Sequence, residues 1–221
     1  MEINKIIRSK RKTIALQIND DSSLIVRAPF NTSVEIINQV ILKHKGWVER
    51  KRNELHSRNL RLAQKVYSNG EGFLYIGNYY QLKLVDHQDI PLIFDDAFYL
   101  SRKYLFRANQ ILIEWYRKKA YEKICERVNC FAKDRGLKYN KVKITNARRR
   151  WGSCSSQGNL NFSWRLIMAP LPVLDYVIIH ELVHLTEKNH SQAFWGKVML
   201  LMPDYEEQKN WLKRNGYLLR L

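Results

Sequence analysis

The start of the chain alternates between apolar and polar residues, as half-buried β-strands do. The alternation predicts one strand over residues 13–18 and a second over residues 24–28. The run between them, residues 19–23, consists of Asn, Asp and Ser, which favour turns. We therefore expect a β-hairpin at this end of the chain.

A helix is predicted next, over residues 34–55. Its apolar residues recur at the three- and four-residue intervals that keep side chains on one face of a helix. Thr32 and Ser33 precede it, and either hydroxyl can serve as the N-cap by accepting a hydrogen bond from the first turn. We expect this helix to pack on the strands.

Residues 69–108 return to the strand pattern. Gly77-Asn78 is a two-residue hairpin signal, because both residue types tolerate the positive φ angles of such a turn. The turn would join strands over residues 73–76 and 79–85. Two shorter strands are expected at residues 91–94 and 98–100.

From about residue 109 the pattern becomes mostly helical. A long amphipathic helix is predicted up to Gly136, a residue type that often follows a helix C-terminus. Further on, the sequence predicts strands at 142–145 and 159–166, a helix ahead of His184, a helix that Ser191 caps and Pro203 ends, and a last helix over 205–215.

These elements indicate an α+β fold in two domains. Residues 1–108 would form a small, basic, β-rich N-terminal domain with one helix. Residues 109–221 would form a second domain built around the helix that ends near His184.

The composition narrows the cellular setting. No apolar run is long enough to cross a membrane, and the N-terminus lacks the hydrophobic stretch of a signal peptide. The three cysteines, Cys125, Cys130 and Cys154, form no C-x-x-C pair, which excludes a zinc ribbon or finger. Such sparse cysteine usage suits a reducing compartment, so we expect a cytoplasmic protein with no membrane partner.

The chain is strongly basic. It has 38 Lys and Arg against 21 Asp and Glu, a formal net charge of +17. This excess favours electrostatic contact with a polyanion such as nucleic acid or nucleotide phosphates. No RRM, KH or C₂H₂ pattern is present, so sequence-specific nucleic-acid recognition is not predicted.

The pentapeptide at residues 180–184 is the clearest indication of a functional site. It reads His-Glu-Leu-Val-His, and on a helix His180 and His184 lie on one face about 6 Å apart along the axis. Two imidazoles so placed can share one metal ion, and Glu181 is then next to that ion, where it can take a proton from water. This is the H-E-x-x-H arrangement of zinc hydrolases. The alternative is a core helix with two hydrogen-bonded histidines.

A third ligand is predicted from spacing. His190 follows His184 by six residues, as the third histidine of metzincins does, although Glu187 stands here where that pattern has glycine. A turn after Thr186 could bring His190 back to the metal. The rivals are carboxylates further along, Glu206 and Glu207, and we favour His190 over both.

Further motifs accompany the histidines along the second half of the chain. They are Trp115-Tyr-Arg117, Arg150-Trp-Gly-Ser-Cys154, Gly158, Trp164-Arg-Leu166, Pro170, Asp175-Tyr-Val177, His180-Glu-Leu-Val-His184, Asn189-His-Ser191, Phe194-Trp195 and Pro203-Asp-Tyr205. In these residues the chain resembles the YgjP-like family of metal-dependent hydrolases, which is related to SprT-type and other zincins. The resemblance implies a zincin-like metallopeptidase domain over residues 109–221, with His180, His184 and His190 as ligands of one Zn²⁺ and Glu181 as general base. Other divalent metals would also suit the ligands.

The arginine run before Trp151 suggests one more site residue. The guanidinium of Arg150, if it projects toward the metal, could stabilise the oxyanion of a tetrahedral intermediate or bind a phosphate. Trp151 and Gly152 are interpreted as structural, with Trp151 packed under the helix of the motif. Cys154 could be a metal ligand in principle, but three histidines and a water already complete a catalytic tetrahedron.

Three functions therefore remain open. The first is a zinc metallopeptidase that acts on a peptide or protein substrate, with metal-activated water and Glu181 as base. The second is a metal-dependent pyrophosphohydrolase of nucleotides, which the basic charge favours and the imidazole ligands disfavour. The third is a nucleic-acid-associated module in which the metal is structural and has a fourth protein ligand.

Overall fold

The computed structural model describes residues 3–19, 21–61 and 65–221. Contacts between Cα atoms divide the chain into two compact units, Met1–Gln64 and Lys65–Leu221, and each has its own apolar core. Among the described residues, no helix is both long enough and apolar enough to cross a membrane.

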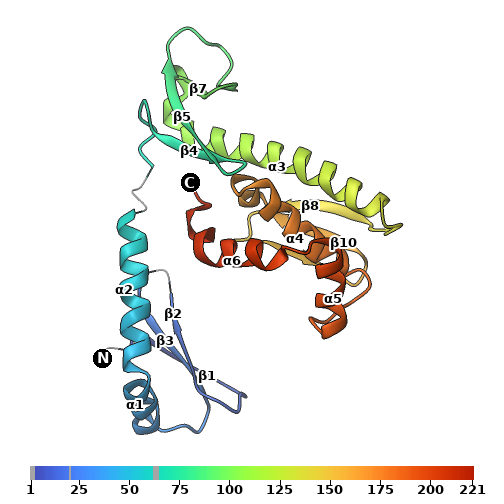
Figure 1. The fold of residues 1–221 in the computed structure, drawn as a ribbon. Coiled ribbons are helices and arrows are strands. Elements are labelled where there is room, and N and C mark those ends of the chain that lie inside the picture. The colour runs from blue at the N-terminus through green and yellow to red at the C-terminus, as the bar shows by residue number, and fades with distance from the viewer. Residues whose placement is uncertain (1–2, 20, 62–64) are drawn as a thin grey trace. The chain divides into compact units, whose positions relative to one another are not determined.

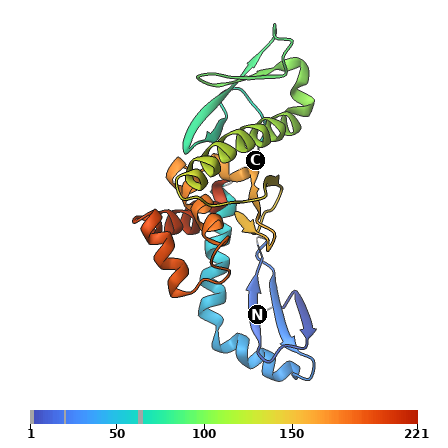
Figure 2. The ribbon, with the colours of Figure 1, turned by 90° about the vertical axis from the view of Figure 1, so that its right-hand side faces the viewer.

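The first unit packs two helices on a three-stranded sheet in the order β1-β3-β2 (Figure 2). The predicted hairpin is present: β2 and β3 are antiparallel, with Ile18 opposite Leu24. Asp20 of its turn lies outside the described residues. Strand β1, which the alternation did not predict, pairs parallel with β3. The elements are β1 (Lys5–Ser9), β2 (Ala15–Ile18), β3 (Leu24–Pro29), α1 (Val34–Lys43) and α2 (Lys45–Arg61).

The helix predicted over residues 34–55 is two helices. The Ser33 hydroxyl caps the first, accepting a hydrogen bond from the Ile36 N–H at 3.3 Å. His44 ends it in a non-helical conformation, and α2 begins at the next residue. Ile37 and Ile41 point into the core of this unit, which explains the apolar spacing that predicted the helix.

The second unit contains the other two sheets, of four and three strands, and the long helix α3 that packs beside them (Figure 1). The four-stranded sheet has the order β4-β5-β7-β6 and the three-stranded sheet β8-β10-β9. The elements are β4 (Gly72–Tyr75), β5 (Asn78–Val85), β6 (Leu92–Phe94), β7 (Phe98–Ser101), a 3₁₀ turn η1 (Arg102–Arg107), α3 (Ala108–Lys133), β8 (Lys141–Thr145), β9 (Gly152–Cys154), β10 (Asn159–Ser163), a 3₁₀ turn η2 (Trp164–Met168), α4 (Leu171–Val183), α5 (Gln192–Leu201), α6 (Tyr205–Asn215) and a 3₁₀ turn η3 (Gly216–Leu218).

The α+β fold class is confirmed, but the compact units meet at residues 64 and 65 instead of near residue 108. Phe73, Phe98 and Leu100, from the β-rich segment, belong to the same core as Leu112 of α3. The sequence pattern changes near residue 108 because strands give way to helices there. The core does not change, because both kinds of element bury their apolar faces against each other.

The hairpin between β4 and β5 turns one residue earlier than expected. Tyr75 pairs with Asn78, so the two turn residues are Ile76 and Gly77, both with positive φ (48° and 81°). Their N–H groups donate to the carbonyls of Ile167 and Met168, at 2.9 and 3.1 Å. The tip of this hairpin is therefore hydrogen-bonded to η2, the turn that leads into α4.

Helix α4 is buried along nearly its whole length and is held to α3 by one ion pair. Every residue from Val173 to Ile179 is buried, including the charged Asp175. The Arg127 guanidinium donates two hydrogen bonds to the Asp175 carboxylate, each 2.7 Å long. This two-point contact satisfies the buried charge and fixes the position of α4 along α3.

Replacing Asp175 by Asn should destabilise the protein by about 2–3 kcal/mol, because it removes the negative charge and puts an amide NH₂ in place of one of the two oxygens that accept from Arg127. Denaturant unfolding measures this. The matched control is Glu126→Gln, which breaks the exposed pair between Lys123 and Glu126 on α3 (2.7 Å) and should cost no more than about 0.5 kcal/mol. Equal losses in the two variants would contradict the role given to Asp175.

Candidate metal centre

The three predicted histidines meet at the C-terminal end of α4. One nitrogen from each of His180, His184 and His190 lies within 4.8 Å of the others, and among the described residues these three form the group that could hold a metal. Glu206, Glu207 and Cys154, the rival or additional ligands weighed from the sequence, are not members of that group. That the three histidines bind a metal remains a prediction, which the geometry below supports.

The chain returns to the helix end through a tight turn. The helix ends at Val183 with His184 as its C-cap, and the Glu187 N–H donates to the Val183 carbonyl at 2.9 Å. The Lys188 amine donates to the His184 carbonyl at 3.0 Å and so covers an unpaired helix-end acceptor. No described residue of this turn has a positive φ. The metzincin-type glycine is therefore not needed for His190 to reach the cluster.

The imidazole geometry suits a metal. The Nε2 atoms of His180 and His190 lie 3.0 Å apart, near the roughly 3.3 Å expected between two ligands of tetrahedral zinc. His184 Nδ1 lies 2.8 Å from the Glu187 carbonyl oxygen. A carbonyl only accepts, so Nδ1 carries the proton and the lone pair of Nε2 is available to a metal.

The surroundings of His180 and His190 favour the neutral imidazole, the form that binds metals. Burial, reinforced by the charges of His184, His190 and Lys209, lowers the pKa of His180 to about 3. The pKa of His190 is lowered too, by burial first and then by His184 and Lys209.

Phe194 packs against all three imidazoles, a role that the sequence did not predict. Phe194, at the start of α5, is fully buried, and its ring centroid lies 4.6–4.9 Å from those of His180, His184 and His190. Its position is set by the N-cap of α5, because its N–H donates to the Ser191 hydroxyl at 3.3 Å. The capped start of α5 therefore places both His190 and the apolar residue that packs against the cluster.

Glu181 lies beside the cluster and is buried, with 5% of its surface exposed. Burial raises the pKa of Glu181 to about 7, against the opposing effect of the Arg150 charge. Such a carboxyl can exchange a proton near neutral pH, as a general base must. Arg150 itself is exposed, and its charge lowers the pKa of Glu181.

Strand β9 lines the cavity of the cluster, and it begins at Gly152, a residue interpreted from the sequence as structural. A Cβ on Gly152 would lie 2.5 Å from Oε1 of Glu181 and 2.6 Å from its Cγ. Only glycine therefore fits opposite this carboxylate. Trp151 lines the cavity beside Glu181 together with Val177 of α4, and it packs on Gly216, whose Cβ would lie 2.8 Å from the indole.

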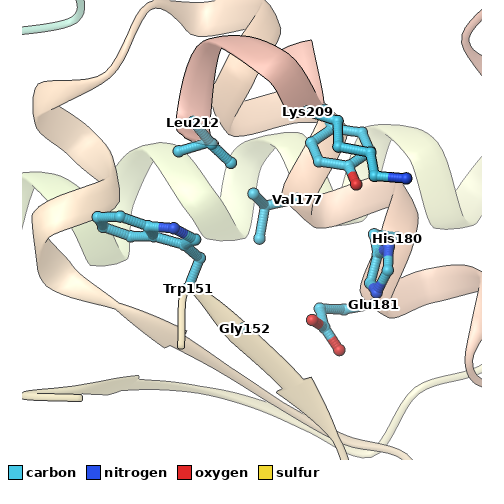
Figure 3. A pocket seen from close by; sticks show the side chains of 8 residues that line it. Trp151, Gly152, Val177, His180, Glu181, Lys209 and Leu212 are labelled. Atoms are coloured by element: carbon cyan, nitrogen blue, oxygen red, sulfur yellow. The ribbon is translucent and has the colours of Figure 1, made fainter. Parts of the chain in front are cut away.

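Two cavities flank Glu181. One, of about 310 Å³, is lined by Trp151, Val177, Lys209 and Leu212 together with the site residues (Figure 3). The other, of about 300 Å³, is lined by Ser153, Cys154 and Lys188 together with all three histidines of the cluster. Gly152, His180 and Glu181 border both cavities. The second cavity therefore contains the candidate metal centre, and the first lies next to it.

The family model for the YgjP-like metallopeptidase domain matches residues 12–215 of the chain. The chain belongs to this family. The match covers nearly the whole chain, including the N-terminal unit that the sequence motifs had left out.

No curated protein matches the chain. Among solved structures, the crystal structure of the metallopeptidase zymogen abylysin from Pyrococcus abyssi is similar, with a TM-score of 0.38 and 19% identity. That similarity covers 41% of this chain and 93% of abylysin.

Replacing His190 by Ala should weaken Zn²⁺ binding by more than about a hundredfold, because a lost ligand costs more than the lost hydrogen-bond partner of a ligand. Titration calorimetry and the rise in melting temperature with added Zn²⁺ both report it. The control is His87→Ala, which removes an exposed histidine outside the cluster. Unchanged zinc affinity in His190→Ala would overturn the choice of third ligand and return Glu206 and Glu207 to consideration.

Replacing Gly152 by Ala should destabilise the protein by about 1–3 kcal/mol, because the added methyl group overlaps the Glu181 side chain. Denaturant unfolding measures the loss. Gly196→Ala on α5 is the matched control: nothing lies within 4 Å of its added Cβ, so it should be neutral or stabilise by about 0.5–1 kcal/mol.

The same contact predicts a specific rescue. Adding Glu181→Ala to Gly152→Ala removes the overlapping atoms, so the double variant should be more stable than the sum of the two single effects predicts. Additive losses would show that Gly152 and Glu181 are not in conflict when a methyl group is added.

Proposed function

We propose that the protein is a zinc-dependent peptidase. The observation that carries the proposal is the buried Glu181 carboxyl next to the cluster of His180, His184 and His190 in a chain of a metallopeptidase family. The proposed substrate is a peptide or protein, in keeping with the family description.

The three imidazoles would hold the metal through one nitrogen each. A zinc ion in such a site supplies a Lewis acid that polarises the scissile carbonyl and makes water a better nucleophile at neutral pH. Among the described residues the cluster offers three protein ligands, as catalytic zinc sites do, whereas structural sites have four. This number favours a catalytic centre over the structural metal of a nucleic-acid-associated module.

Glu181 would act as the general base. It takes a proton from the attacking water and gives it to the leaving amine. Burial supports this role, because it raises the pKa of the carboxyl to about 7 and so allows both steps near neutral pH. Gly152, directly opposite, leaves no room for the carboxylate to swing toward β9.

Arg150 would act on the oxyanion of the tetrahedral intermediate. The support for this role is its charge, which is close enough to lower the pKa of Glu181, and a guanidinium can donate two hydrogen bonds to an anionic oxygen.

The cavity next to the candidate metal centre supports a peptide substrate in particular. A side chain beside a scissile bond needs space, and the cavity of about 310 Å³ that His180 and Glu181 border offers it. A nucleotide pyrophosphohydrolase would instead need carboxylates to hold Mg²⁺ against phosphates. The candidate ligand group consists of imidazoles, which does not favour that alternative.

Replacing Glu181 by Gln should lower peptide hydrolysis by about 10²–10⁴-fold while leaving zinc affinity nearly unchanged, because the base is lost and the ligands remain. Turnover of a mixed peptide library by the zinc-loaded chain, followed by mass spectrometry, gives the first measurement, and calorimetry gives the second.

The matched control is Glu206→Gln, on the exposed first turn of α6. It should retain both activity and zinc. Full hydrolysis by the Glu181 variant would refute the assignment of the base, and loss of zinc from the Glu206 variant would reassign the third ligand.

A further inference from the structure

The cavity beside Glu181 has one apolar side and one charged side. Figure 3 shows Trp151 and Leu212 on one side of it, and His180, Glu181 and Lys209 on the other, with Val177 between them. Val177 and Leu212 are buried residues, so the apolar side is firmly packed. The cavity, at about 310 Å³, is at the lower end of the range for ligand pockets. It is suited to one large side chain.

Lys209 interrupts the apolar face of α6. Tyr205, Lys209 and Leu212 recur at helical spacing on α6, and Tyr205 and Leu212 are both buried. An apolar residue at position 209 would extend that buried stripe. The lysine instead brings a positive charge to the rim of the cavity.

The Lys209 amine is held in place by a contact with Trp195. It lies 4.1 Å from the centroid of the Trp195 ring, a cation–π contact that holds the side chain over this ring. The same indole stacks on His190, with centroids 5.7 Å apart. Lys209 also lines the same cavity as His180 and Glu181. A fixed cation therefore lies beside the candidate metal centre.

This cation has no carboxylate partner within 4 Å among the residues that the structure describes. Glu206 and Glu207, on the same helix, do not pair with it. The Glu181 carboxylate is the acid that shares the cavity, but it is buried against Gly152 and forms no ion pair with Lys209. The Lys209 amine is therefore available to form an ion pair with an anionic group of a ligand.

We propose that this cavity is a specificity site for a substrate residue with a large apolar side chain and an adjacent carboxylate, in which Lys209 binds the carboxylate. The side chain packs against Trp151, Val177 and Leu212. The carboxylate is either the C-terminus of that residue or the side chain of an acidic residue that follows it. The proposal rests on the proposed peptidase function and names the substrate that this function would prefer.

Binding can be measured apart from turnover. The zinc-loaded Glu181→Gln chain is titrated by calorimetry with two acetylated peptides, Ac-Gly-Gly-Phe as the free acid and as the C-terminal amide. The free acid should bind about tenfold more tightly, as a charge-assisted hydrogen bond provides. Ac-Gly-Gly-Ala as the free acid should bind more weakly than the Phe acid, because it leaves the apolar wall uncovered.

Variants of Lys209 assign the preference. Lys209→Met keeps the alkyl chain over Trp195 but removes the charge, so the preference for the acid over the amide should disappear. Lys209→Arg should restore it. Lys213→Met, an exposed lysine one turn further along α6, is the matched control and should leave the preference unchanged.

A third peptide distinguishes the two sources of the carboxylate. If Ac-Gly-Gly-Phe-Asp-NH₂ binds as tightly as the free acid, the carboxylate of the following side chain is accepted. If it binds like the amide, the C-terminal carboxylate is the one recognised. Either result supports carboxylate binding by Lys209 only if the Lys209→Met variant also binds the preferred carboxylate peptide more weakly.

Three results overturn the proposal: equal binding of acid and amide, no binding of either, or a preference that persists in Lys209→Met. The last would point to Arg150 as the anion's partner. Failure of the proposed peptidase function would give a different result from failure of the Lys209 proposal. In that case the carboxylate preference is intact, but the chain with Glu181 hydrolyses no peptide of the library.

Discussion

The burial of α4 is the constraint on which the rest of the structure depends. On an apolar helix packed on all sides, each unpaired charge or polar group costs several kcal/mol. Asp175 meets this requirement through its two hydrogen bonds to Arg127 on α3. At the other end of the helix, His180 and His184 converge with His190 of the following loop. The burial that holds the helix in place also keeps the imidazole of His180 neutral, the form that would bind a metal.

Glycine and phenylalanine residues do as much for the site as the ionisable groups. Gly152 lets β9 approach Glu181 so closely that no other residue would fit, and this approach keeps water from surrounding the carboxyl on that side. Phe194 packs against all three imidazoles and limits their rotation. The tip of the β4–β5 hairpin is hydrogen-bonded to the turn before α4. Each of these contacts reduces the freedom of the site before any ligand binds, which lowers the entropic cost of binding one.

Many features could be predicted from the sequence, because they depend on local rules. The H-E-x-x-H spacing places two imidazoles on one helical face, the serine caps of α1 and α5 occur where the residue types indicated, and most strands lie within a residue or two of their predicted bounds. Two strands were missed. Strand β1 pairs parallel with a distant strand, and β9 is only three residues long, so neither produces a pattern long enough to detect.

The sequence alone predicted the type of chemistry: three histidines and a glutamate at fixed spacing, together with the motifs around them, indicate a metal centre. Only the tertiary structure decided how that chemistry is surrounded. Segments far apart in the chain bring Gly152 against Glu181, join the strands of residues 72–101 to the core of α3, and place Lys209 over Trp195 at the rim of a cavity. The physical reason is that burial and close contact are properties of the packed chain. Periodicity shows which face of an element is apolar, but it does not show what that face will touch.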